Sequence, residues 1–413
     1  MSGFASWLMR ARERRSRTLH LLWLVAGLAF AGLVIVSFLQ DEAADFQPVW
    51  KAADALLAGA SPYAFNPRFV YPPSALPLVS PLGLLDSDTA RALFLAADAA
   101  MIVVAGLLCL RIFGVSLRSP AAPLLVLVLS GFAPVDTTLH LGNVNGFILA
   151  GGAGFLLAAT RGRWRLGGWL LGFTLALKPI LAPVLLLTVL YRQWGALARA
   201  IAVPAALLCS ALLLAPRAAD YFDARVGFYA EANAGKGLNS NVAIGGAVET
   251  LGLPVELSLL VRAAIVAACA YLIWMLFRQR GEGPASRLVD IFAVIMVGTV
   301  LAYTFSLNYY ALYLLPLLVA ALLARSAMRW WGLVGGVVLF GSPDVYVWRT
   351  LWREDGRLAL QLSTMRVTLG LMVVLAAYLA ALPPGARERE LLAKALARLR
   401  RPASPASAVR ERG

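Results

Sequence analysis

Residues 18–40 read TLHLLWLVAGLAFAGLVIVSFLQ, an apolar run long enough to cross a bilayer as one helix. Similar runs recur at about 88–110, 121–136, 143–160, 166–191, 197–215, 256–277, 288–306, 309–324, 329–343 and 364–382. Of the 413 residues, 60% are hydrophobic and 14% are charged, with a mean hydropathy of +0.75. A soluble domain cannot bury so much apolar surface. The sequence therefore predicts an all-α polytopic membrane protein with about 12 transmembrane helices.

The formal net charge of +15 does not indicate a nucleic-acid partner, because the basic residues gather in short connectors between apolar runs. Such connectors lie on the cytoplasmic side of a membrane. They contain Arg111 and Arg118; Arg161, Arg163 and Arg165; Arg192 and Arg199; Arg278, Arg280 and Arg287; and Arg325 and Arg329. We expect a multi-pass protein surrounded by membrane lipids, with both termini cytoplasmic.

The run 166–191 is flanked by arginines at both ends, although the two ends of a single span lie on opposite sides of the membrane. Pro179 follows Lys178 in its middle and removes a backbone donor there. We therefore expect two short helices that turn back at this point, which returns every basic connector to one side. The organisation predicted is a single transmembrane domain over 1–383, with external loops 40–87, 216–255 and 343–363, and a basic cytoplasmic tail over 384–413.

The cysteine and histidine content does not indicate a metal site or a disulfide framework. The cysteines Cys109, Cys209 and Cys269 all fall within apolar runs, which does not suit a disulfide framework or a thiolate site. The only histidines are His20 and His140. We predict no metal site and no cofactor.

Residues 44–85, ADFQPVWKAADALLAGASPYAFNPRFVYPPSALPLVSPLGLL, follow the first span. From Phe46 onward the apolar residues recur at helical spacing, which predicts an amphipathic helix on the outer leaflet. Asp45 precedes this helix. It is either the helix N-cap or a carboxylate that accepts the proton of an incoming hydroxyl, and the two roles are compatible. The prolines beyond it turn the chain back, and Tyr63 and Tyr71 there are either interfacial anchors or sugar-binding rings.

Lys178 lies deep in an apolar run, where an ammonium needs a partner or an anionic ligand. A lipid-borne phosphate would suit it, and snorkelling or an internal ion pair is the alternative. The sequence HLGNVNGF places His140, Asn143 and Asn145 at the external start of a span, as hydroxyl-binding groups or as a helix cap.

Two further polar segments are expected on the same side of the membrane, so that a shared cavity is predicted. The loop 216–255 offers hydrogen-bond donors for a sugar or phosphate, unless it is simply a solvated loop. Polar residues also stand at the external end of the run 288–306. The candidates in these two segments are Arg225, Lys236, Asn239, Asn241, Asn308 and Tyr309.

The order of these motifs resembles glycosyltransferase family 87, integral-membrane enzymes that use polyprenyl-phosphate sugars and are typified by bacterial α-mannosyltransferases. The resemblance covers about 40–320. It consists of Asp45-Phe46, the turn Gly59-Ala60-Ser61-Pro62-Tyr63, Tyr71-Pro72-Pro73, Gly142-Asn143-Val144-Asn145, Lys178-Pro179 and Asn239-Ser240-Asn241. Two positions depart from the family pattern. Asn143 replaces the usual glutamine, and Ser306-Leu307-Asn308-Tyr309-Tyr310 stands where actinobacterial members have Ser-x-x-His-His.

The resemblance implies the GT-C architecture and inverting transfer, with Asp45 as the catalytic base. The donor is then a polyprenyl-phosphate sugar, with mannose or another hexose or pentose, and the acceptor is a hydroxyl of a lipid or cell-envelope glycan. It also implies a bacterial inner membrane with the active site facing the periplasm or exterior. The alternative is a lipid-linked sugar transporter or flippase, but we find no repeat of residues 40–87 in the second half, as related halves would predict.

Overall fold

The computed structural model describes residues 17–39, 43–63, 69–233, 241–278, 283–323 and 356–381, together with 335, 336, 338, 339 and 341. The first half comprises α2 (Arg17–Leu39), α3 (Phe46–Leu57), η1 (Pro73–Ala75), α4 (Leu76–Val79), η2 (Ser80–Leu84), α5 (Ser87–Ile112), α6 (Ala121–Ser130), α7 (Ala133–Leu141), α8 (Asn145–Thr160), α9 (Trp164–Leu177), η3 (Pro179–Val184) and α10 (Leu185–Leu190). The second half comprises α11 (Trp194–Leu214), η4 (Ala218–Asp220), α12 (Tyr221–Asn233), α13 (Ile244–Thr250), α14 (Val255–Arg278), α15 (Pro284–Ala302), η6 (Asn308–Leu314), α16 (Leu315–Leu323) and α19 (Gly356–Ala381). The all-α polytopic prediction is confirmed.

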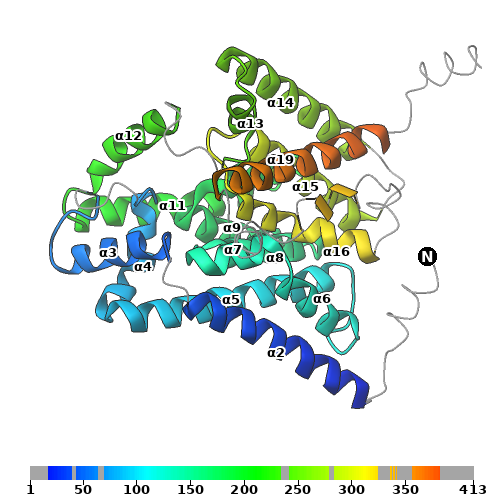
Figure 1. Cartoon of the computed structure of the whole chain (residues 1–413), viewed down its shortest axis with the longest axis horizontal. Helices are drawn as coiled ribbons and strands as arrows, with labels where there is room; N and C mark the ends of the chain where they lie inside the picture. Colours follow the sequence, from blue (N-terminus) through cyan, green and yellow to red (C-terminus); the bar gives the residue numbers. More distant parts are fainter. Residues whose placement is uncertain are drawn as a thin grey trace, which may run out of the picture.

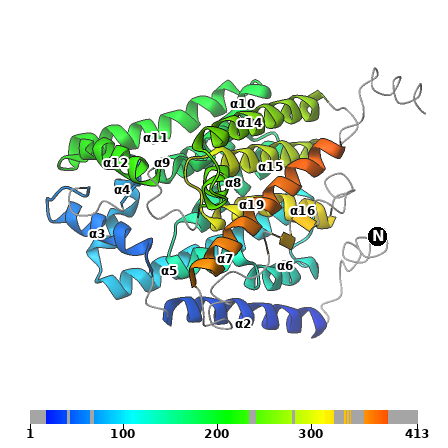
Figure 2. The same ribbon diagram turned by 45° about the horizontal axis from the view of Figure 1, so that its top comes forward.

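The helices form one bundle in which α8 and α15 lie inside and α2 lies along the outer edge (Figures 1 and 2). Residues of α15 are largely buried, whereas many leucines and valines of α2 are exposed. Exposed apolar side chains over a whole helix suit a lipid-facing position, because hydrocarbon replaces water around them. The predicted basic tail over 384–413 lies outside the described residues.

Within the described residues, six helices are long and apolar enough to cross a membrane, and the bent pair α6–α7, with 60° between its parts, would make a seventh. The expected count of about twelve is larger for two reasons. The runs 143–160, 166–191 and 309–324 form helices of fewer than 18 residues, and most of 329–343 falls outside the described residues.

The expected break within 166–191 is confirmed. Lys178 ends α9 in an extended conformation (φ −154°, ψ 115°), and η3 begins at Pro179. The ring of Trp164, at the start of α9, lies 5.4 Å from the ring of Tyr191, just after α10. The chain therefore turns back at Lys178 and forms a helical hairpin.

Described residues of three of the basic connectors gather at the end of the bundle where this hairpin opens. The Tyr191 ring also lies 5.4 Å from Phe277, next to Arg278 at the end of α14. Arg287, near the start of α15, interacts electrostatically with Tyr191. Arg161 and Arg163 directly precede α9. Basic residues therefore gather at one end of the bundle, and the lengths of α8 and α9 separate this end from Asn145 and Lys178.

The amphipathic helix predicted from Phe46 is confirmed as α3. Its residues Phe46, Val49, Ala52 and Ala53 are buried, whereas Asp54 is exposed. The indole of Trp50 donates a hydrogen bond of 3.1 Å to the Leu85 carbonyl oxygen. These contacts fix α3 beside the start of α5, so that the residue before α3 has a defined position.

Candidate active site

Asp45 lies just before α3, with its main chain tied to the end of α7. Its amide donates to the Leu141 carbonyl oxygen at 2.9 Å. The half-buried side chain makes no capping hydrogen bond to α3, so the helix-cap interpretation of this carboxylate is wrong. Its Oδ2 instead accepts a hydrogen bond of 2.7 Å from Nδ2 of Asn143.

Asn143 is presented by a tight turn between α7 and α8. Gly142 ends α7 with φ +65°, a left-handed conformation that glycine adopts without steric penalty. A Cβ at this position would lie 2.7 Å from the Cβ of Phe46. The glycine therefore allows both the turn and the close approach of α3, which brings Asp45 to Asn143.

Lys178 lies on the other side of the same amide. Its Nζ donates to Oδ1 of Asn143 at 3.1 Å and to Oδ1 of Asn145 at 3.2 Å. Both partners are neutral, and no carboxylate within the described residues pairs directly with this ammonium. A cation whose hydrogen bonds go to neutral amide oxygens is suited to receive an anionic group.

Aromatic rings surround the ammonium of Lys178. Its Nζ lies 4.7 Å from the ring centroid of Tyr310, 5.3 Å from that of Tyr309 and 5.8 Å from that of Tyr71. Rings within about 6 Å stabilise a cation through their electron-rich faces. The Tyr309 hydroxyl also accepts from Nδ2 of Asn143 at 3.2 Å. Three residues predicted to bind substrate, Tyr71, Tyr309 and Asn143, thus share one site with Lys178.

Tyr63 contributes indirectly, through the Tyr71 segment. Its hydroxyl donates to the Tyr71 carbonyl oxygen at 3.0 Å, and its ring lies against Phe69 and Tyr221. Arg225 of α12 lies beside the same segment and donates to the Val70 carbonyl oxygen at 3.2 Å and to the Tyr303 hydroxyl at 3.3 Å. It also interacts electrostatically with Lys178.

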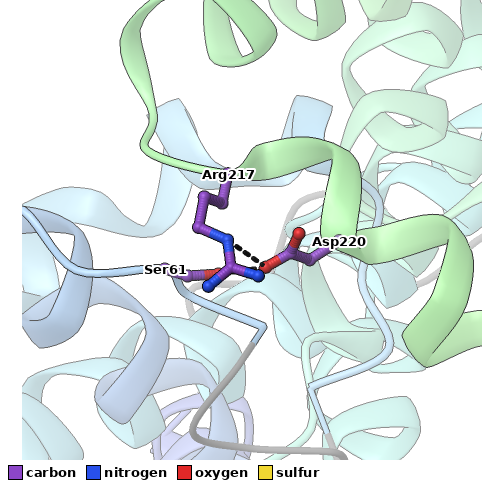
Figure 3. Close-up of polar contacts among 3 residues, drawn as sticks. All are labelled: Ser61, Arg217 and Asp220. Atoms are coloured by element: carbon purple, nitrogen blue, oxygen red, sulfur yellow. Dashed lines mark hydrogen bonds and ion pairs between the residues drawn. The ribbon is translucent and has the colours of Figure 1, made fainter.

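A polar contact attaches η4, just before α12, to the turn that carries Tyr63. Figure 3 shows Ser61, Arg217 and Asp220 together: the Ser61 hydroxyl donates to Oδ2 of Asp220 at 3.0 Å, and Nε of Arg217 lies 3.2 Å from the same oxygen. This contact fixes Asp220 beside Ser61, so the beginning of the predicted loop 216–255 is joined to the turn after α3.

The remaining predicted site residues lie around this centre. Asn241 is buried and bonds the backbone of Ala243, Thr304 and Ser306, so its polar atoms tie two loops together. His140 is buried on α7, which packs against η6. Nδ2 of Asn308, at the start of η6, donates to the Thr137 hydroxyl at 3.4 Å. The candidates Lys236 and Asn239 lie outside the described residues.

Three residues of the site were not among the sequence candidates. Tyr310 faces Lys178, and the Tyr313 hydroxyl donates to Oδ1 of Asn145 at 2.6 Å. Asp98 is a buried carboxylate on α5, next to Gly146 and Phe147. A carboxylate within a membrane-length helix is itself a signal of function, so Asp98 was detectable from sequence.

An apolar groove of about 420 Å³ lies between α5, α8 and α9. Its lining begins near Phe147, two residues after Asn145, and reaches Arg161 and Arg163 at the basic end of the bundle. The lining consists of Met101, Val104, Leu108, Phe147, Ala150, Gly151, Gly154, Leu157, Ala158, Arg161, Arg163, Leu166 and Leu170. Such a lining suits a hydrocarbon chain.

The arrangement can support proton transfer next to an anion site. Asp45 can accept a proton, and the ammonium of Lys178 can hold a phosphate on the other side of Asn143. Among the described residues, no group of three or more histidine, cysteine, aspartate or glutamate side chains could hold a metal ion.

Comparison with known proteins identifies the family. The model of glycosyltransferase family 87 matches residues 69–304. The alpha-(1->3)-arabinofuranosyltransferase of Mycobacterium tuberculosis is 32% identical over 341 residues, which cover 80% of this chain and 77% of that protein. Enzymes of the same name from Mycolicibacterium smegmatis and Corynebacterium glutamicum are 31% and 26% identical, each over 80% of this chain.

These relatives transfer arabinofuranose by name, so the mannosyltransferase expectation is not supported. The expectation of a membrane glycosyltransferase is supported. The family model matches more than half of the chain, and a relative is 32% identical over the 341 residues that align with it, so the chain belongs to glycosyltransferase family 87.

Proposed function

We propose that this membrane glycosyltransferase transfers a pentofuranose, with arabinofuranose as the first candidate, from a polyprenyl phosphate to a hydroxyl of a lipid or cell-envelope glycan. The sugar is inferred from the names of the relatives. The observation that carries the proposal is the amide of Asn143, which bonds Asp45 and Lys178 at the same time.

The reaction is a single displacement at the anomeric carbon. The acceptor hydroxyl gives its proton to Asp45 as its oxygen forms a bond to that carbon. The bond between the anomeric carbon and the phosphate oxygen breaks on the opposite face, and the polyprenyl phosphate leaves with its electron pair. A phosphate ester is already a good leaving group, and the ammonium of Lys178 stabilises the charge it carries away.

The positions of the two groups fit this displacement. Asp45 bonds Nδ2 of Asn143 and Lys178 bonds its Oδ1, so that a base and an anion site are held as separate groups by one amide, as the reaction requires. Displacement inverts the configuration at the anomeric carbon, so an α-linked product requires a β-linked donor. The groove along α5, α8 and α9 offers an apolar surface for the polyprenyl chain.

Transfer by the purified protein in lipid nanodiscs would test the proposal. The donors are polyprenyl-phosphate β-arabinofuranose and polyprenyl-phosphate mannose, and the acceptor is an arabinofuranosyl oligosaccharide. We expect transfer from the first donor, and a loss of about 100-fold or more in Asp45→Asn, as removal of a general base produces. The matched control is Asp54→Asn, an exposed carboxylate on α3 that should retain full activity.

Three outcomes would contradict the proposal. Transfer from the mannose donor alone would overturn the sugar, and undiminished transfer by Asp45→Asn would remove this residue as base. When the protein is instead reconstituted in closed vesicles, movement of the lipid-linked sugar across the vesicle membrane without transfer would favour the flippase alternative.

A further inference from the structure

Asp98 occupies an unusual position for a carboxylate. It lies within α5, a helix of membrane length, and only 1% of its surface is exposed. A buried carboxylate in such a helix is energetically costly and is retained where it has a partner or a function. Nothing in the displacement described above uses it.

The carboxylate is held at the start of α8. Its Oδ1 accepts from the amide of Phe147 at 3.3 Å, and the Gly146 amide also bonds to it. The first amides of a helix have no partner within the helix and carry partial positive charge. Asp98 thus caps α8 from a neighbouring helix.

Gly146 makes this approach possible. A Cβ at that position would collide with the Asp98 carbonyl oxygen and lie 2.6 Å from its Oδ1. The first turn of α8 and the Asp98 carboxylate are therefore in direct contact, with no room for a larger side chain between them.

The residue that begins this turn is Asn145. Its Oδ1 accepts from Nζ of Lys178 at 3.2 Å and from the Tyr313 hydroxyl at 2.6 Å. Its Nδ2 and the Oδ2 of Asp98 are both buried and have no hydrogen-bond partner within the described residues. Asp98 also interacts electrostatically with Lys178.

We propose that Asp98 is a positioning residue: it fixes the first turn of α8, so that Asn145 holds Lys178 in place for the phosphate of the donor. This inference rests on the proposed function, because it assigns the phosphate to Lys178. Asp98 touches neither the sugar nor the acceptor in this role.

Kinetic constants separate this role from a general structural one. Asp98→Ala leaves the two amides without an acceptor, and we expect the donor KM to rise about 10-fold with the acceptor KM unchanged. Asp98→Asn keeps a side-chain oxygen for the amides and should restore the donor KM to within about 3-fold of the wild type. Asp88→Asn, an exposed carboxylate at the start of α5, is the matched control and should change neither constant.

A double-mutant cycle adds a second kinetic readout. If Asp98 acts through Asn145, the Asp98→Ala and Asn145→Ala losses will not add, and the double variant will resemble Asn145→Ala alone. Additive losses, or equal rises in both KM values, would overturn the proposal.

Hydrogen–deuterium exchange tests the same contact without activity. The amides of residues 146–148 should exchange faster in Asp98→Ala than in wild type or Asp98→Asn, with the rest of α8 unchanged. Unaltered exchange in this turn would overturn the inference whatever the enzyme transfers. If the exchange difference is present but the wild-type protein transfers no sugar, the proposed function is overturned. The contact between Asp98 and the first turn of α8 would then still be established.

Discussion

Asp45 and Lys178 lie on opposite sides of a single side-chain amide, that of Asn143. Nδ2 of Asn143 donates to the carboxylate at 2.7 Å, and Oδ1 accepts from the ammonium at 3.1 Å. The two charges are thus oriented by the same neutral group and do not need to neutralise each other by direct contact. This separation leaves each one available to a different part of a substrate.

Asn143→Ala removes both of these hydrogen bonds. Hydrogen bonds to charged groups contribute about 1.5–3 kcal/mol, so we expect kcat/KM to fall about 10- to 100-fold. Asn143→Gln restores an amide on a side chain one methylene longer and should recover part of the loss. Steady-state kinetics with the arabinofuranose donor provide the measurement. Full activity in Asn143→Ala would show that the two charges do not depend on this amide.

Lys178→Ala should act on donor binding. Loss of a charge-assisted contact to phosphate predicts a rise of about 10- to 100-fold in the donor KM. Lys178→Arg keeps the charge on a larger group among the rings of Tyr71, Tyr309 and Tyr310, and we expect an intermediate value. Lys51→Ala, an exposed lysine on α3, is the control. An unchanged donor KM in Lys178→Ala would place the phosphate elsewhere.

The sequence could predict that Asp45 and Lys178 belong to one site, because ionisable groups at or within a membrane are energetically costly and few. Asp45 and Lys178 stand out for this reason, and the break at Pro179 explains how Lys178 reaches the end of the bundle that carries Asp45. Asp98 has the same signal, but its partner is the backbone at the start of α8, which no sequence pattern reveals.

The roles of neutral polar residues were harder to predict. The sequence places Asn143 and Asn241 equally well in a binding site, yet one bonds to two charged side chains and the other ties two loops through backbone contacts. An amide can donate and accept, so its residue type does not distinguish these roles. The number of membrane-spanning helices was also hard to predict, because it depends on the length of each helix. Breaks within apolar runs, which produce short helices such as α9 and α10, make these lengths difficult to read from the sequence.

Gly142→Ala should destabilise the protein more than a glycine substitution in open space. A left-handed residue other than glycine costs about 1–2 kcal/mol, and at Gly142 (φ +65°) the added methyl also meets Phe46 at 2.7 Å. Gly114→Ala is the matched control, because Gly114 has φ +72° with no atom within 4 Å of the added carbon. Thermal denaturation in detergent would compare the two variants. Equal midpoints would show that α3 can move away from Gly142 at little cost.

Cysteine accessibility would decide which side of the membrane the site faces. In a Cys209→Ser background, which removes an exposed native thiol, Ala44→Cys places a thiol next to Asp45, and Arg163→Cys places one at the basic end; both positions are exposed. Arginine-rich connectors favour the cytoplasmic side, so a membrane-impermeant maleimide added to intact cells should label Ala44→Cys only. Arg163→Cys should react after permeabilisation, and retained transferase activity would verify that both variants fold. The reverse labelling pattern would place the site in the cytoplasm, where an acceptor in the cell envelope could not reach it.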